Sequence, residues 1–306
     1  MNVDHKYRIC ISKVTGRKVI FWCEYDAIWN DSKSFLGKPM YFSNLNTLPY
    51  DKVTIFGTEY VNLWKLSTPL IYLQNGALRT LCYLLAPDLM LTSDVPFCRS
   101  LCVVPVSNVV ETISSRNVYD KLISGQNQLG EKVRRIVAFL GRRCNFGIVG
   151  GQALNISPPT NDLDIVVYSD TLSDLSKVLE RFWSLNFQTD YLKELWPLSI
   201  RHPTWGNIDL FPELSSAPPF FKQLTSCTVL HENFEFTGTI TNDELGFLAT
   251  PTWGIDSSAY MISTDTALKG RLRCGYQVGG IATKTITKDG TVILQIDSSK
   301  DIYRRL

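Results

Sequence analysis

The residues best suited to chemistry lie in one segment of the chain, residues 146–168. Asp162 and Asp164 stand on either side of a leucine at the start of an apolar run, and ten residues separate them from the pair Gly150-Gly151. Side chains at positions i and i+2 of a strand point to the same face, so the two carboxylates are expected to project together. Carboxylates held that close repel each other unless a cation lies between them, which predicts an oxygen-rich Mg²⁺ site.

A third aspartate, Asp209, stands between Ile208 and Leu210 on another apolar run. If this run is a strand beside the one that follows Asp162, three carboxylates converge. Phosphoryl transfer needs such an arrangement, because two metal ions hold the triphosphate and a carboxylate helps to deprotonate the attacking hydroxyl. The sequence therefore predicts a site for two Mg²⁺ ions, with Mn²⁺ as an alternative, whose ligands are Asp162, Asp164 and Asp209.

Taken together, these segments resemble the core signature of the polymerase β-like nucleotidyltransferase superfamily. The resemblance covers residues 146–211 and is carried by Gly150-Gly151, Asp162-Leu163-Asp164-Ile165 and Ile208-Asp209-Leu210. It implies a small mixed sheet with helices on one side. It also implies that the first two aspartates bind both metal ions, and that the third completes the catalytic metal site and acts as, or next to, the general base. One departure is Gly151, because many members have a serine there whose hydroxyl contacts phosphate.

The expected activity is that of a Mg²⁺-dependent nucleotidyltransferase, which transfers NMP from an NTP such as ATP to a hydroxyl group and releases pyrophosphate. Nucleotide contacts are expected from Gly150, Gly151, Gln152 and Arg201. The acceptor stays open among an RNA end, a small molecule and a protein side chain. Two other classes also stay open: a catalytically silent nucleotide- or RNA-binding regulatory module, and an antitoxin-like interaction protein.

Two further features have both a plain and a functional interpretation. The first is a basic cluster, which is either a solvated helix surface or a track for a phosphate backbone. Its members are Lys132, Arg134, Arg135, Arg142 and Arg143. The second is Trp205, four residues before Asp209, which either serves the core or stacks on a nucleotide base.

The elements that must position these residues follow from the apolar pattern. Residues 107–140 are expected to be helical and to end at Gly141, since apolar residues recur there at three- and four-residue spacing. Strands are expected at residues 146–149, 163–168 and 208–211, and a second amphipathic helix at residues 172–182.

The segments on either side of this core are predicted to be rich in β-strands. The predicted organisation is an N-terminal β-rich module (residues 1–105), a nucleotidyltransferase core (106–220) and a C-terminal β-rich module (221–306), which makes the fold class α+β. This layout is similar to a group of predicted nucleotidyltransferases best known from archaea. The similarity is carried by residues 8–25, 104–110 and 252–302.

Within the flanks, a hairpin around Gly16 is expected between strands at residues 7–14 and 18–25, with a further strand at 53–56 and a buried helix at 70–85. Residues 215–219 are a linker candidate. The tail is expected to form a small glycine-punctuated sheet or barrel. Its expected strands are residues 234–240, 259–263, 276–282 and 291–296.

The length and composition of the chain limit the classes of protein to which it can belong. The 306 residues suffice for two ordinary domains at about 150 residues each, and 44% hydrophobic with 20% charged content is typical of a globular protein with a large core. A net charge of +2 argues against a surface that is basic throughout for nucleic acid. With no long apolar run and no signal-peptide pattern at the start, a cytoplasmic protein without a membrane partner is expected. The sequence leaves the oligomeric state open.

Overall fold

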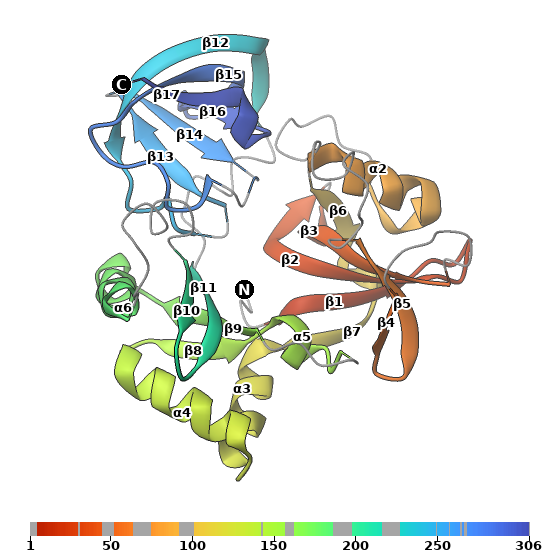
Figure 1. The fold of residues 1–306 in the computed structure, drawn as a ribbon. Helices are drawn as coiled ribbons and strands as arrows, with labels where there is room; N and C mark the ends of the chain where they lie inside the picture. The colour runs from red at the N-terminus through yellow and green to blue at the C-terminus, as the bar shows by residue number, and fades with distance from the viewer. Residues whose placement is uncertain are drawn as a thin grey trace. The chain divides into compact units, whose positions relative to one another are not determined.

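A computed structural model of the chain consists mainly of strands, with a smaller number of helices. In the part it describes, the strands form three sheets, and the α+β class expected from the sequence is confirmed (Figure 1). The described residues are 5–29, 31–44, 52–63, 75–91, 101–141, 143–156, 162–185, 198–215, 227–248, 250–256, 258–263, 265 and 268–305.

Contacts within the chain divide it into two compact units. The first contains residues 113–216 with two short pieces, residues 1–6 and 54–57, and the second contains residues 7–53, 58–112 and 217–306. Every residue that the sequence assigns to the site belongs to the first unit. The boundaries at residues 105 and 220 stay predictions.

The first unit is built on a mixed sheet with the strand order β10-β11-β9-β8. β10 (Ser199–His202) pairs antiparallel with β11 (Gly206–Leu214), β11 pairs parallel with β9 (Leu163–Ser169), and β9 pairs antiparallel with β8 (Asn145–Ile148). β9 is rich in β-branched residues and almost entirely buried, as a central strand should be. The parallel pair needs a crossover connection, which contains α6 (Leu172–Ser184).

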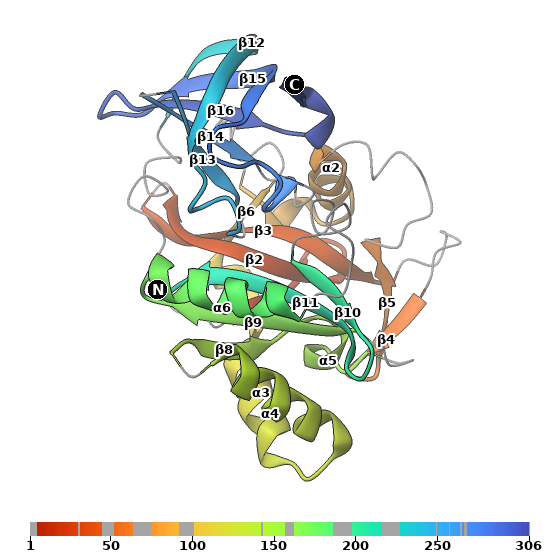
Figure 2. The same cartoon turned by 60° about the vertical axis from the view of Figure 1, so that its left-hand side comes forward.

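Four helices accompany this sheet: α3 (Ser115–Ser124), α4 (Gln128–Leu140), the single turn α5 (Gly150–Ala153) and α6. α6 packs on β9 and β11, α3 contacts β8, and α4 contacts both α3 and α6 (Figure 2). α4 begins at Asn127, whose side chain accepts a hydrogen bond from the Gly130 backbone N–H at 2.7 Å. It ends at Gly141, where φ is +103°.

A larger sheet contains the N-terminal strands, most of whose residues belong to the second unit. Its order is β4-β5-β3-β2-β1-β7, with β6 paired to β3. The helix α2 (Asn75–Leu85) packs its apolar side chains on the buried core of this sheet. The strands are β1 (His5–Ile11), β2 (Lys18–Trp29), β3 (Ser32–Ser43), β4 (Lys52–Ile55), β5 (Thr58–Asn62), β6 (Cys102–Pro105) and β7 (Val109–Ser114).

The C-terminal strands form the third sheet, also in the second unit, in the order β12-β13-β14-β16-β15-β17. Because β12 pairs with β15 as well as with β13, five of these strands close into a ring. Trp253 is fully buried inside it and donates its indole N–H to the Leu272 carbonyl at 3.2 Å. The strands are β12 (Thr228–Asn242), β13 (Thr252–Ile255), β14 (Ala259–Ser263), β15 (Gln277–Ile286), β16 (Val292–Ile296) and β17 (Ile302–Arg305).

The helix expected over residues 107–140 is partly wrong. Val109–Ser114 forms the strand β7, and a break at residues 125–127 separates α3 from α4. β-Branched residues favour the strand, and Ser114 starts α3 by accepting a hydrogen bond from the Asn117 backbone N–H at 3.1 Å. The strands β3, β5, β6, β10, β13 and β17 were not predicted. Residues 70–74 of the expected helix and 216–219 of the linker candidate lie outside the described residues.

Candidate active site

Asp164 and Asp209 stand directly opposite each other on the neighbouring parallel strands β9 and β11. Their side chains point to the same face of the sheet, and their carboxyl groups hydrogen-bond to each other. Leu163 and Ile165, on either side of Asp164, are buried on the opposite face, as strand alternation requires. The sheet therefore brings two of the three expected carboxylates into contact.

Ser199 completes this row of polar side chains. It lies opposite Asp209 in the antiparallel pair β10–β11, and its hydroxyl donates a hydrogen bond to Asp209 Oδ1. Asp209 is thus held between Asp164 on one side and Ser199 on the other. The sequence carried no signal for Ser199, because only the register of β10 against β11 places it there.

Gly150 lies against the carboxyl group of Asp164. Its φ is +66°, a conformation that favours glycine, and a Cβ atom at this position would overlap the Asp164 carboxyl group. The Val149 backbone N–H donates to the Asp164 carbonyl at 3.0 Å, which fixes the turn beside β9. Glycine is therefore required at residue 150 both by the backbone and by the space that Asp164 fills.

The two paired carboxyl groups are strongly perturbed. Burial, followed by the negative charges of Asp209 and Asp162, raises the pKa of Asp164 to about 7. Burial also raises the pKa of Asp209 to about 6, with a contribution from the charge of Asp162. Asp164 therefore takes up a proton first and donates it to Asp209, so that near neutral pH the pair shares one proton.

The free energy of unfolding of the metal-free protein is expected to fall as the pH rises from about 4 to about 7. An aspartate in the unfolded chain titrates near 3.8, whereas folded Asp164 keeps its proton up to about pH 7, so the folded state binds more protons between these values. At about 1.4 kcal/mol per pH unit, the loss is on the order of 4 kcal/mol.

Denaturant unfolding in EDTA between about pH 4 and pH 8 measures this loss as a difference between the unaltered protein and Asp164→Asn. Asparagine does not titrate, and the remaining carboxylates are common to both proteins. Equal pH dependence in the two proteins would contradict a protonated Asp164.

Asp162 lies just before β9 and is exposed. Its Oδ1 atom accepts a hydrogen bond from the Asn207 side-chain amide at 2.9 Å, which gives this carboxylate a partner outside the pair. Among the described residues, no three His, Cys, Asp or Glu side chains are arranged as a metal-binding group. The donors nevertheless fit Mg²⁺, because they are all oxygens and because a divalent cation would relieve the repulsion that raises both pKa values.

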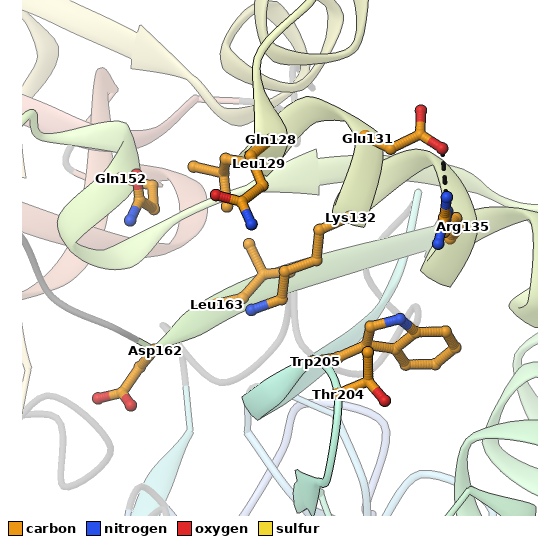
Figure 3. A pocket seen from close by; sticks show the side chains of 10 residues that line it. All are labelled: Gln128, Leu129, Glu131, Lys132, Arg135, Gln152, Asp162, Leu163, Thr204 and Trp205. Carbon is orange, nitrogen blue, oxygen red and sulfur yellow. Dashed lines mark hydrogen bonds and ion pairs between the residues drawn. The ribbon is translucent and has the colours of Figure 1, made fainter.

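A pocket of about 510 Å³ adjoins Asp162, and we call it the α4 pocket. Figure 3 shows Lys132 extending from α4 over Leu163 toward the Asp162 end, with Trp205 and Thr204 at the other end below Arg135. Two of the expected site residues, Asp162 and Gln152, line the pocket, whereas Gly150, Gly151, Asp164, Asp209 and Arg201 are not among its lining residues. These are Gln128, Leu129, Glu131, Lys132, Arg135, Gln152, Asp162, Leu163, Thr204 and Trp205.

Arg201 lies outside the α4 pocket but close to the carboxyl groups. It is exposed on β10, opposite Asn207, and on the same face as Ser199 two residues earlier. Its guanidinium group is therefore on the sheet face that carries Asp209. This position suits a contact with a phosphate group of a ligand bound at that face.

The members of the basic cluster have different roles. Arg134 donates hydrogen bonds to the carbonyls of Ile123 and Gly125, the latter at 3.0 Å, so it secures the connection between α3 and α4. Arg143 lies 3.8 Å from Asp174. Lys132 and Arg135 line the α4 pocket, and Arg135 also forms an ion pair with Glu131 at 2.9 Å; Arg142 lies outside the described residues.

No family model, curated protein or solved structure matches the chain. The superfamily resemblance carried by the glycines and aspartates therefore stays a prediction. Function has to be argued from the carboxyl pair, its neighbours and the α4 pocket. Among the described residues, no helix is both long enough and apolar enough to cross a membrane.

Proposed function

We propose that this chain is a Mg²⁺-dependent nucleotidyltransferase with a polymerase β-like core, which transfers NMP from an NTP to a hydroxyl acceptor and releases pyrophosphate. The observation that carries the proposal is the contact between Asp164 and Asp209 on adjacent parallel strands, next to Gly150 of the glycine pair. Paired carboxyl groups with raised pKa values are costly to keep in a fold. Their presence beside a glycine turn supports a site for a cation and a phosphate.

In the proposed reaction, the acceptor oxygen attacks the α-phosphorus of the NTP. The bond from this phosphorus to the bridging oxygen of the β-phosphate breaks, and pyrophosphate leaves with the electron pair. Asp209 accepts the hydroxyl proton as the general base, since its carboxylate lies in the pair on β9 and β11. Ser199 orients Asp209 through its hydrogen bond.

The remaining residues bind and position the substrate. The Gly150-Gly151 turn receives the triphosphate, because it opens α5 and its two glycines add no side chains of their own. Arg201 contributes positive charge at the same sheet face. Asp162, Asp164 and Asp209 would hold the Mg²⁺ ions, which when bound neutralise charge on the triphosphate.

One observation favours a second candidate, a nucleotide-binding module without turnover. Asp162 is hydrogen-bonded to Asn207 instead of joining the Asp164–Asp209 pair. If this hydrogen bond persists when nucleotide binds, the third carboxylate does not reach the metal ions. Binding of NTP without pyrophosphate release would then be the outcome.

The test is Mg²⁺-dependent incorporation of each α-labelled NTP into total cellular RNA and protein, with pyrophosphate release measured in parallel. The double variant Asp162→Ala plus Asp164→Ala is the inactive comparison. Asp170→Ala is the matched control, because Asp170 is an exposed aspartate of the same unit that lies beyond the end of β9.

Label that appears with the unaltered protein and with Asp170→Ala, but not with the double variant, is the expected result. The size distribution of the labelled product then identifies the acceptor class. Nucleotide binding without label in any protein would replace the proposal by the silent module. Absence of nucleotide binding would remove both candidates.

A further inference from the structure

The α4 pocket is separate from the place assigned to the triphosphate. Among the expected site residues it shares Asp162 and Gln152 with that place, but Gly150, Asp164 and Asp209 do not line it. A volume of about 510 Å³ is within the usual range for small-molecule sites. Leu163, which lines the pocket, points to the sheet face opposite Asp164, so a ligand in the pocket would not occupy the space next to the glycine turn.

Lys132 is the cation of the pocket that is open to a ligand. Arg135 is already paired with Glu131 at 2.9 Å, whereas no ion pair links Lys132 to a carboxylate in the described part of the chain. Lys132 is half-buried, and burial lowers its pKa although the charge of Asp162 acts in the opposite direction. A partly desolvated ammonium group gains more from an anionic partner than an exposed one does.

Trp205 supplies a fixed aromatic wall. Its ring stacks on His202, with ring centroids 4.2 Å apart and an angle of 20° between the planes. The backbone N–H groups of Thr204 and Trp205 donate to His202 Nδ1, each at 3.2 Å, which fixes the turn between β10 and β11. The indole is thus held in place before any ligand arrives, which reduces the entropy lost on stacking.

The ammonium group of Lys132 lies near the turn that carries Trp205. A Cβ atom at Gly206, the residue after Trp205, would be 4.0 Å from Lys132 Nζ, so the lysine reaches the turn that carries the tryptophan. Leu129 and Leu163 give the pocket apolar surface, and Gln128 and Gln152 add amide groups that can hydrogen-bond to a base edge. A ligand that satisfies all of these groups combines a phosphate with a flat, polar-edged aromatic ring.

We propose that the α4 pocket binds a nucleoside monophosphate unit, with the phosphate on Lys132 and the base on Trp205. The unit is either a free nucleotide or the terminal residue of an RNA chain, since both present the same chemistry. The binding of this unit is measurable without turnover, so its test does not depend on the proposed transferase function.

The experiment is equilibrium dialysis of the full chain with radiolabelled AMP in EDTA, which silences metal-dependent binding. Lys132→Ala and Trp205→Leu are each expected to weaken AMP binding by about tenfold or more, because each removes one charge-assisted or stacking contact. Lys121→Ala, a change on α3 away from the pocket-lining residues, and Asp164→Asn are expected to leave AMP binding unchanged.

The variant Asp162→Asn distinguishes binding in the α4 pocket from binding at the carboxyl pair. In EDTA its carboxylate opposes a phosphate in the pocket, so removal of the charge is expected to tighten AMP binding several-fold. A nucleotide bound at the carboxyl pair through metal would instead be weakened by this change. Circular dichroism of each variant checks that the fold is retained.

Competition identifies the source of the ligand. If a short RNA displaces labelled AMP at a lower concentration than unlabelled AMP does, the pocket binds an RNA end. If unlabelled AMP is the better competitor, the pocket binds a free nucleotide. Either result supports the proposal. Absence of AMP binding, equal weakening by Lys121→Ala, or weakening by Asp164→Asn overturns it. NTP turnover with no AMP binding would overturn only nucleotide binding in the α4 pocket, while AMP binding without turnover would overturn the transferase function.

Discussion

Replacing Asp164 with asparagine is expected to lower Mg²⁺-dependent nucleotidyl transfer by about 1000-fold or more. Asparagine keeps the size of the side chain and can still donate a hydrogen bond to Asp209, but it carries no negative charge for a metal ion. The same change is expected to stabilise the metal-free protein at pH 8 by an amount on the order of 4 kcal/mol, because a buried charge beside two other carboxylates is removed.

Activity and stability therefore move in opposite directions, which distinguishes a functional carboxylate from a structural one. The measurements are pyrophosphate release at saturating NTP and the melting temperature in EDTA and in Mg²⁺. Mg²⁺ is expected to raise the melting temperature of the unaltered protein and of Asp170→Asn, but not that of Asp164→Asn. A variant that is both active and less stable would show that Asp164 serves the fold alone.

Gly150→Ala is expected to destabilise the protein by about 3 to 4 kcal/mol and to abolish transfer. The left-handed backbone at φ +66° accounts for about 1 kcal/mol of this cost. The larger part comes from the new methyl group, which would overlap the Asp164 carboxyl group and force the paired carboxyl groups apart. Denaturant unfolding and pyrophosphate release measure the two effects.

Gly16 provides a matched control for this change. Its φ is +68°, but none of the surrounding atoms lies within 4 Å of the position that a Cβ atom would take, so Gly16→Ala should cost only the backbone strain, about 1 kcal/mol. In the double variant Gly150→Ala plus Asp164→Ala the overlap is removed, and most of the stability should return. Equal costs at residues 16 and 150, or no recovery in the double variant, would mean that Asp164 does not contact Gly150.

Local pattern was sufficient for many elements of the fold. The apolar spacing that predicted a helix ending at Gly141 matches α4, and the alternating runs around Gly16 match β1 and β2. The pattern failed at residues 109–114, where apolar residues within an otherwise helical stretch form β7. Short apolar runs are ambiguous in isolation, and pairing with β1 in the sheet decides this one.

For the candidate site, the sequence by itself determined which residues carry the chemistry: two aspartates at strand spacing, a third on an apolar run, and a glycine pair ahead of them. These features are local, because residue type and spacing depend only on the order of the chain. It also determined that Leu163 turns away from Asp164, since strand alternation is a property of the backbone.

Only the tertiary structure decided how these residues meet. The register of β9 against β11 sets Asp164 beside Asp209, the register of β10 against β11 adds Ser199, and Asn207 holds Asp162 apart from the pair. The α4 pocket likewise exists only because α4, α5 and the turn after β10 meet at one edge of the sheet. Such contacts join residues far apart in the chain, and their geometry follows from strand order and helix packing, which no local spacing records.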